Sequence, residues 1–218
     1  MNDATHSSQV QTINDYRDSV EPQLAFVGLF DVLGFKSRLS DHGLDEVRSG
    51  YRQLVDRKVD AGVVPVFSGA GGTYRRLATT IFSDTILLWC IDEWEAVQTL
   101  VTGAAYLLAT AVDMRWPLRG ALAYGQCVLD RQSRTFIGQP IIEAYEAEQA
   151  QEWVGAALTS SVTCHPLLGA RVQSLEDVVE YPVPVKDGHH ALTHALHWCP
   201  YSSRASVELD ASFVNVQF

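Results

Sequence analysis

The stretch QLAFVGLFDVLGF, residues 23–35, decides how this sequence is interpreted. Its part LAFVGLFDV is an apolar run rich in β-forming residues, as expected for a buried strand in the middle of a sheet. One carboxylate, Asp31, interrupts that run. A charged group is costly to bury without compensation, so Asp31 needs a partner or a ligand.

The segments that follow alternate between helical and strand-like patterns. Two short β-like runs are separated only by Ser83 and Asp84, which predicts a tight hairpin with an acidic tip. A long segment with an apolar helical face ends before Pro117. The elements expected in this part of the chain are a strand at 24–32, a helix at 40–58, strands at 77–82 and 85–91, a helix at 93–114 and a strand at 118–129.

This βαββαβ order predicts an α+β fold of the ferredoxin-like type, a mainly antiparallel sheet with helices on one face. C-terminal additions are expected as a helix at 140–151 and strands at 153–159, 179–186 and 194–198. Strands this apolar need cover on both faces, from later helices or from a second copy of the chain. We expect a symmetric homodimer.

Composition sets the broad class. The chain has 218 residues, 47% of them apolar, which is enough for one sizeable core. We expect a flexible N-terminal arm at 1–22 and a single domain at 23–218. A net charge of −10 disfavours nucleic acid and anionic membranes as partners. The polar start lacks the pattern of a signal peptide and no apolar run approaches a membrane span, so we expect a cytoplasmic protein.

The predicted topology gives Asp31 a neighbour. The first strand and the hairpin are adjacent in such a sheet, so Asp31 and Asp84 would meet at one end. Carboxylates forced together are relieved by a raised pKa or by a divalent cation such as Mg²⁺ or Mn²⁺. Exposed N–H groups of Leu33, Gly34 and Phe35, at the turn into a helix, could receive phosphate. The alternative is that Asp31 caps a turn and Asp84 decorates a hairpin, and spacing alone leaves both interpretations open.

Four short motifs carry a family resemblance. D-V-L-G-F at 31–35, F-S-D-T-I at 82–86, L-R-G-A-L-A-Y-G at 118–125 and I-G-Q-P-I-I-E-A-Y at 137–145 resemble, in order and rough spacing, the class III nucleotidyl cyclase domain. The resemblance covers about residues 24–200. More narrowly, the chain is similar to the pyrimidine nucleotide (uridylate) cyclases of bacterial Pycsar anti-phage systems.

The resemblance implies roles at the matching positions. Asp31 and Asp84 match two metal-binding aspartates, and the backbone carbonyl of Val32 matches a further ligand in a site for two Mn²⁺ or Mg²⁺ ions. Arg119 matches a strand arginine that contacts the triphosphate, with a surface charge as the alternative. Lys186 falls near a late phosphate-binding lysine contributed across a dimer, although a solvated turn lysine is an equal alternative. The family builds its active sites at the interface of a head-to-tail homodimer.

Base recognition departs from the purine cyclases. Their base-selecting positions, six residues before the hairpin aspartate and three before the later glycine, are Ala78 and Thr135 here. Tyr51, on the first helix, matches a tyrosine of the pyrimidine branch, and its ring could narrow the pocket around a one-ring base. A plain core role for Tyr51 is equally compatible with its place in an apolar stripe.

The usual transition-state helix is also altered. The positions that carry Asn and Arg in purine cyclases are Ile142 and Glu146 here. Either Arg75, Arg76 or Arg119 supplies the positive charge, or the domain is a degenerate, non-catalytic module for nucleotide sensing or dimerisation.

The resemblance therefore favours a cyclase that converts UTP to 3′,5′-cyclic UMP, with CTP to cyclic CMP as the alternative. A cyclic-nucleotide-responsive effector would act through the product. A separate cluster, His190, His194 and His197, has helical spacing for a soft metal, but its segment alternates like a strand and no further ligand completes the set.

Overall fold

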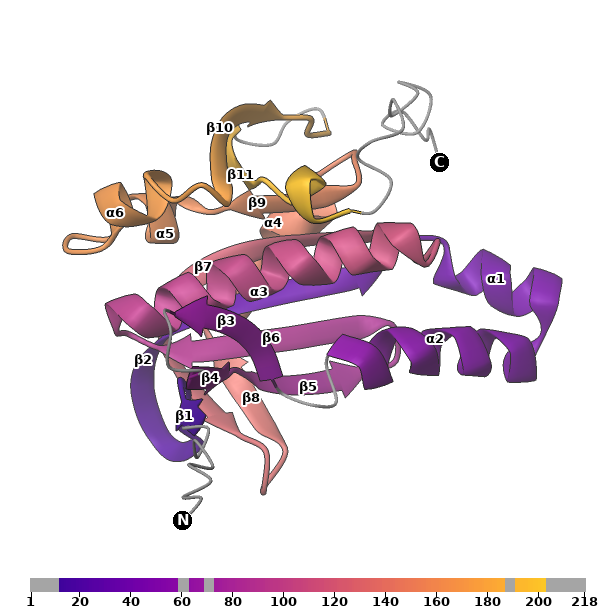
Figure 1. Cartoon of the computed structure of the whole chain (residues 1–218), viewed down its shortest axis with the longest axis horizontal. Helices are drawn as coiled ribbons and strands as arrows, with labels where there is room; N and C mark the ends of the chain where they lie inside the picture. Colours follow the sequence, from indigo (N-terminus) through magenta and orange to yellow (C-terminus); the bar gives the residue numbers. More distant parts are fainter. Residues whose placement is uncertain (1–11, 59–62, 69–72, 187–190, 203–218) are drawn as a thin grey trace, which may run out of the picture.

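The computed structural model describes residues 12–58, 63–68, 73–186 and 191–202 (Figure 1). The strands are β1 Thr12–Asn14, β2 Ser19–Val32, β3 Val63–Ser68, β4 Thr73–Arg76, β5 Ala78–Phe82, β6 Thr85–Ile91, β7 Leu118–Asp130, β8 Thr135–Gly138, β9 Gly155–Leu158, β10 Val178–Val183 and β11 Leu192–Leu196. The helices are α1 Phe35–His42, α2 Leu44–Lys58, α3 Trp94–Asp113, α4 Gln139–Ala150, α5 Ser160–Thr163 and α6 Gly169–Gln173, with a 3₁₀ turn at Cys199–Tyr201.

The main sheet has the strand order β10-β11-β9-β7-β2-β6-β5, and β8 also pairs with β7. Its section β7-β2-β6-β5 is antiparallel throughout, which confirms the predicted ferredoxin-like βαββαβ core. The C-terminal additions extend this sheet, because β9 pairs in parallel with the first half of β7. A separate three-stranded sheet contains β1, β4 and β3.

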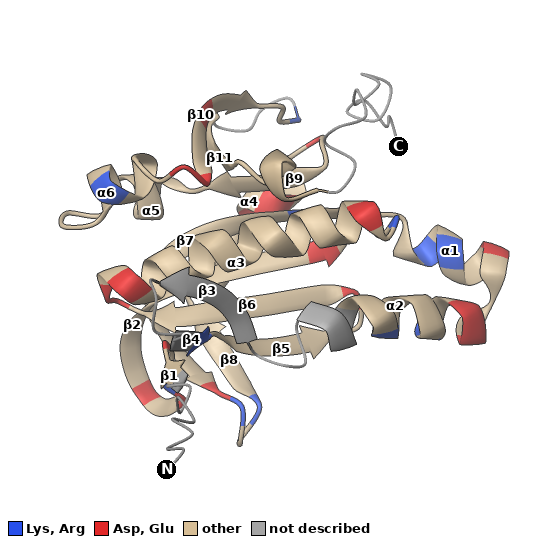
Figure 2. Ribbon diagram, in the orientation of Figure 1, with Lys and Arg blue, Asp and Glu red and all other residues tan. Residues whose placement is uncertain are grey.

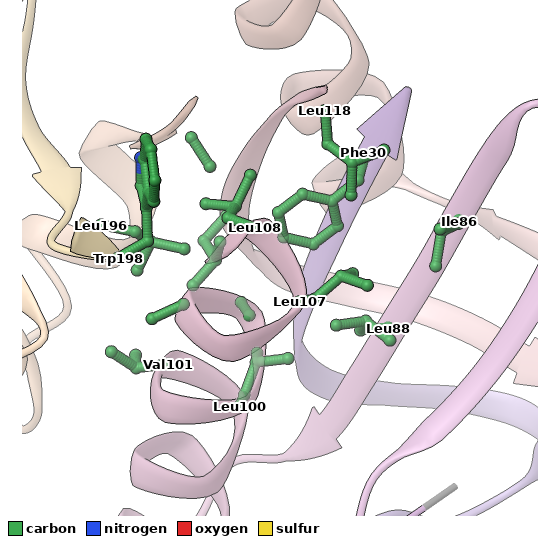
Figure 3. Packing of buried hydrophobic residues seen from close by; sticks show 14 of the residues in the cluster. Phe30, Ile86, Leu88, Leu100, Val101, Leu107, Leu108, Leu118, Leu196 and Trp198 are labelled. Atoms are coloured by element: carbon green, nitrogen blue, oxygen red, sulfur yellow. The ribbon is translucent and has the colours of Figure 1, made fainter. Parts of the chain in front are cut away.

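The central strand β2 is buried on both faces because its side chains alternate between two apolar clusters. Phe26 and Phe30 face α3, together with Ile86 and Leu88 of β6 (Figure 3). The intervening residues of β2, Val27 among them, face α4 and β8. A later helix therefore covers the second face, one of the two solutions that the sequence left open.

The long helix α3 is apolar enough, by length and composition, to cross a membrane, but 67% of that stretch is buried inside the protein. Leu100, Val101 and Leu108 are fully buried, and α3 separates the sheet from the segment around Trp198 (Figure 3). Its apolar character is accounted for by this core position.

Two local expectations differ from the structure. Within the arm predicted at 1–22, residues Thr12–Asn14 form β1, which pairs with β4, and β2 already begins at Ser19. The buried Asp15 side chain, paired with Arg75, fixes this segment, a contact that a polar sequence does not reveal. The single helix predicted at 40–58 is divided into α1 and α2 at Gly43, which has a φ of 77°.

Candidate active site

The structure brings Asp31 and Asp84 together at one end of the central sheet. Asp31 lies at the end of β2 and pairs in register with Thr85, the first residue of β6. The N–H of Val32 donates to the carbonyl of Asp84 over 3.1 Å. Figure 2 shows that the acidic end of β2 and the acidic turn before β6 lie at the same end of the sheet. The prediction that Asp31 and Asp84 lie next to each other is therefore confirmed.

The electrostatics of this pair are unfavourable in the protein alone. Burial, followed by the negative charges of Asp84 and Glu148, raises the pKa of Asp31 to about 6. Arg119 and a weak hydrogen bond from the Thr85 hydroxyl, over 3.4 Å, act in the opposite direction. Asp31 is thus a half-buried carboxylate that the fold itself does not fully compensate.

These donors fit a hard divalent cation. Two carboxylates at a strand end supply oxygen ligands, the kind that Mg²⁺ and Mn²⁺ prefer. A strand residue directs its N–H and C=O toward the same neighbour, so the carbonyl of Val32 also faces the hairpin turn. Within the described part of the chain, no group of three or more His, Cys, Asp or Glu side chains is placed to hold a metal ion. Backbone, water or substrate oxygens would therefore complete the coordination.

The turn after Asp31 is shaped by Gly34. Its φ of 72° lies in the left-handed region that favours glycine, and it leads directly into α1. The N–H of Leu33 already donates to the carbonyl of Pro117 over 2.9 Å, so this group is not open to a phosphate. Gly34 and Phe35 remain as the phosphate-binding candidates of this turn.

Tyr51 reaches the same end of the sheet from α2. Its ring packs against Phe35 and Trp116, with centroids 5.5 and 5.9 Å away. Burial, with smaller contributions from Asp84 and Asp31, raises the pKa of Tyr51 to about 12. Its buried hydroxyl has no hydrogen-bond partner among the described residues. The ring packing fits the core role, and base recognition by Tyr51 stays a prediction.

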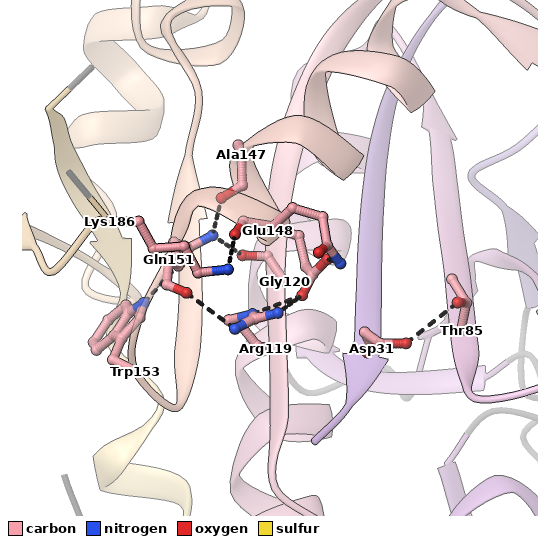
Figure 4. Close-up of polar contacts among 10 residues, drawn as sticks. Asp31, Thr85, Arg119, Gly120, Ala147, Glu148, Gln151, Trp153 and Lys186 are labelled. Carbon is pink, nitrogen blue, oxygen red and sulfur yellow. Dashed lines mark hydrogen bonds and ion pairs between the residues drawn. The ribbon is translucent and has the colours of Figure 1, made fainter. Parts of the chain in front are cut away.

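Arg119 is a residue of β7 and lies directly opposite Asp31 of β2, as the register of the two strands shows. Its guanidinium does not point freely outward, because Nε donates to Oε1 of Glu148 over 2.6 Å and Nη1 donates to the carbonyl of Gln151 over 3.0 Å (Figure 4). Glu148 is 0% exposed and Arg119 is 13% exposed in its side chain. Arg119 is therefore a largely buried, oriented cation and not a surface charge.

The other predicted cations lie elsewhere. Lys186 is exposed, and its Nζ donates to the carbonyl of Gln149 over 2.7 Å, beyond Arg119 as seen from Asp31 (Figure 4). Arg75 donates to the buried Asp15, whose carbonyl accepts from Ile91, so Arg75 belongs to the opposite end of the sheet. Within one chain, Arg75 therefore does not replace the transition-state arginine.

The positions that depart from the purine cyclases have distinct surroundings. Ala78 is fully buried at the start of β5, whereas Ile142 is 52% exposed on α4 and Glu146 is exposed beside it. His194 lies within β11 and His197 just after it, so their segment is a strand, and His190 lies outside the described residues. The helical face required for the soft-metal alternative is not formed.

Sequence reasoning missed Glu148 and Gln151, the two residues that hold Arg119. A signal was present: Pro140, Ala144 and Glu148 recur at four-residue spacing and form the buried face of α4. A glutamate in an apolar helical stripe needs a buried cation. The four-residue pattern is hard to recognise because Glu148 stands among other polar residues in the segment EAEQAQ.

Neither a family model nor a curated protein sequence matches the chain. Among solved structures, the catalytic core of a rhodopsin-guanylyl cyclase with converted specificity, in complex with ATPαS, is similar with a TM-score of 0.51 at 11% identity, covering 80% of this chain and 95% of that one. An adenylate cyclase from Trypanosoma brucei in its monomeric state has a TM-score of 0.48 at 12% identity, covering 82% and 89%. A class III adenylyl cyclase-like ATP-binding protein from Pseudomonas aeruginosa has a TM-score of 0.44 at 13% identity, covering 71% and 40%. The first of these likenesses shows that the chain has the fold of nucleotidyl cyclase catalytic domains.

Proposed function

We propose that this chain, which has a nucleotidyl cyclase fold, is a metal-dependent cyclase that converts UTP to 3′,5′-cyclic UMP and pyrophosphate. The proposal rests on one observation: Asp31 and Asp84 meet at a strand end, where burial and mutual repulsion raise the pKa of Asp31 to about 6. The similar guanylyl cyclase core is solved with ATPαS, which supports a nucleoside triphosphate as the ligand.

The residues of this chain take distinct roles in the proposal. Asp31, Asp84 and the carbonyl of Val32 would hold two Mg²⁺ or Mn²⁺ ions, which when bound supply activation of the ribose 3′-hydroxyl and neutralisation of the α-phosphate. Arg119 directs a charged guanidinium to the same end of the sheet and would contact the triphosphate. The N–H groups of Gly34 and Phe35 would receive a phosphate oxygen.

A pyrimidine is favoured by the aromatic residues around the site. Tyr51, whose hydroxyl senses the charges of Asp84 and Asp31, packs with Phe35 and Trp116, and a base pocket narrowed by these rings would suit a one-ring base better than a two-ring base. The alternative base is cytosine, with CTP as the substrate and cyclic CMP as the product. Neither pyrimidine needs the purine-reading side chains that Ala78 and Thr135 replace.

The cellular setting follows from the same proposal. The product would be a second messenger of a Pycsar-type anti-phage response in the cytoplasm, read by a cyclic-nucleotide-responsive effector. We further propose a homodimer with active sites at the interface, to which Lys186 would contribute from the second copy. Exposed apolar side chains on α4, Ile142 and Tyr145, are available for such an interface.

A second function, a non-catalytic nucleotide-binding module, is favoured by the ion pair that engages Arg119 with Glu148 and by Ile142 in place of a polar catalytic group. Incubation with each of the four nucleoside triphosphates and Mn²⁺, with chromatographic separation of products, distinguishes the two. Cyclic UMP as the main product is expected. Purine-only turnover would overturn the base assignment, and nucleotide binding without any turnover would favour the module.

A further inference from the structure

Glu148 is a fully buried carboxylate that lies next to the candidate site but is not one of its expected ligands. Its exposed fraction is 0%, so water does not solvate its charge. Oε1 accepts from Nε of Arg119 over 2.6 Å and lies 2.6 Å from Nη2, while Oε2 accepts from the Gln149 side chain over 2.6 Å. Removing either partner of such a buried pair leaves an uncompensated charge.

The pair fixes the direction of Arg119. The side chain starts from β7, opposite Asp31, and its guanidinium is held by Glu148 on the side toward Asp31 and by the carbonyl of Gln151 on the other side (Figure 4). Gln151 is itself fixed, because its side chain donates to the carbonyls of Gly120 and Ala147 over 2.8 Å. Arg119 is thus clamped by the C-terminal end of α4 and has little rotamer freedom left.

The clamp does not exhaust the donors of Arg119. A guanidinium carries five N–H groups in a planar fork. Nε and one N–H of Nη2 face Glu148, and one N–H of Nη1 donates to Gln151. One N–H on each Nη atom is therefore not engaged by these two partners and is available to donate to a phosphate oxygen.

We propose that Glu148 is a positioning residue that holds Arg119 for triphosphate binding beside Asp31, a role that rests on the function proposed above. Glu148 does not touch the substrate and acts through the guanidinium. Its loss allows Arg119 to rotate away from the Asp31 end of the sheet, and a misplacement of about 1 Å at such a site can cost about 10²-fold in rate.

A double-mutant cycle tests this role. The proteins are the wild type, Glu148→Ala, Arg119→Ala and the double variant, with Glu152→Gln as the control for an exposed carboxylate at the same helix end. The measurements are kcat and KM for UTP with Mn²⁺ and calorimetric titration with inorganic pyrophosphate and Mn²⁺. Glu148→Ala should lower kcat/KM by roughly 10- to 100-fold, and the double variant should be no worse than Arg119→Ala, because both substitutions remove one oriented cation.

A merely structural role predicts a different outcome. The inference is overturned if folded Glu148→Ala keeps the wild-type kcat/KM and pyrophosphate affinity, or if the two losses multiply in the double variant. If Glu148→Ala does not fold, Glu148→Gln replaces it in the cycle, since its amide oxygen still accepts from Nε. Glu148→Gln should then change kcat/KM a few-fold when Arg119 is present and leave kcat/KM unchanged in the Arg119→Ala background. Equal effects on kcat/KM in both backgrounds would overturn the inference.

The titration separates this inference from the proposed function. If the wild type makes no cyclic product from any triphosphate, the proposed function fails, but pyrophosphate binding is still measurable. Equal weakening by Glu148→Ala and Arg119→Ala then supports positioning by Glu148. An unchanged pyrophosphate affinity in Glu148→Ala overturns it.

Discussion

The carboxylates at the two ends of strand β6 differ in how their charge is compensated. At the far end, Asp92 accepts from the Tyr124 hydroxyl over 2.8 Å and lies 3.3 Å from Nε2 of His165. At the near end, Asp84 faces another carboxylate, Asp31, and its side chain has no hydrogen bond or ion pair with the described residues. The fold supplies partners for Asp92, whereas Asp31 and Asp84 have the uncompensated charge that the proposed metal site requires.

A second acid strengthens this comparison. Asp15 lies at the same end as Asp92 and is 2% exposed, yet Arg75 donates to both of its carboxylate oxygens, over 2.7 and 2.5 Å. At the other end, the cation that lowers the pKa of Asp31 is Arg119, which Glu148 already engages. Local compensation of charge, and not burial alone, distinguishes the candidate site from the structural end of the sheet.

The largest effect is expected when the uncompensated end is changed. Asp84→Asn should lower cyclic nucleotide formation by about 10³-fold or more, because loss of a metal-binding carboxylate removes several kcal/mol of transition-state stabilisation. Product formation from UTP and Mn²⁺ provides the measurement. Asp92→Asn is the matched control at the opposite end and should retain the rate. Equal activity of Asp84→Asn and wild type would show that the Asp31–Asp84 end of the sheet is not a catalytic site.

At the opposite end, where Arg75 pairs with Asp15, a substitution should lower the stability of the fold. Asp15→Asn leaves Arg75 without its charged partner, so we expect the free energy of unfolding to fall by roughly 2–4 kcal/mol. Urea unfolding monitored by tryptophan fluorescence measures this loss. Glu46→Gln on α2, which removes the exposed contact with His42 at the end of α1, should change stability by less than about 0.5 kcal/mol. A small loss for Asp15→Asn would show that this end is not held by its ion pair.

The carboxylate end should gain stability when a charge is removed. The folded chain raises the pKa of Asp31 from 3.8 to about 6, so the folded state binds this proton more tightly than the unfolded state. The stabilising effect of that proton is present below pH 4 and is lost as the pH rises to 6. Asp31→Asn should therefore raise the free energy of unfolding by roughly 1–2 kcal/mol above pH 7 without divalent ions, a figure reduced for partial exposure.

Unfolding curves of the Asp31→Asn variant and the wild type at pH 4 and pH 8, both with chelator, check this prediction. The difference should be small at pH 4 and larger at pH 8. A difference that is independent of pH would mean that Asp31 is not the group that titrates in this window.

The sequence predicted the fold better than the site, for physical reasons that particular residues show. The continuous apolar run of β2 and the hairpin at Ser83 and Asp84 are local patterns, and they were enough to place Asp31 beside Asp84. The clamp on Arg119 depends on α4 packing across the sheet, a contact between segments distant in sequence. The pairing of Asp15 with Arg75 is equally long-range, and the polar sequence around Asp15 by itself predicts a flexible arm.

The smallest effect concerns two tyrosines, one at each end. The buried hydroxyl of Tyr51 has no partner among the described residues, whereas the Tyr124 hydroxyl donates to Asp92. Tyr124→Phe should therefore cost about 1 kcal/mol of stability, and Tyr51→Phe should cost almost none. If the Tyr51 hydroxyl instead binds the substrate, Tyr51→Phe should raise KM for UTP by roughly 2- to 10-fold, the value of one hydrogen bond. Thermal unfolding and steady-state kinetics of both variants distinguish these roles. Unchanged kinetics in Tyr51→Phe would leave this residue as a packed ring of the core, and a loss of stability there would show that its hydroxyl has a partner in the folded chain.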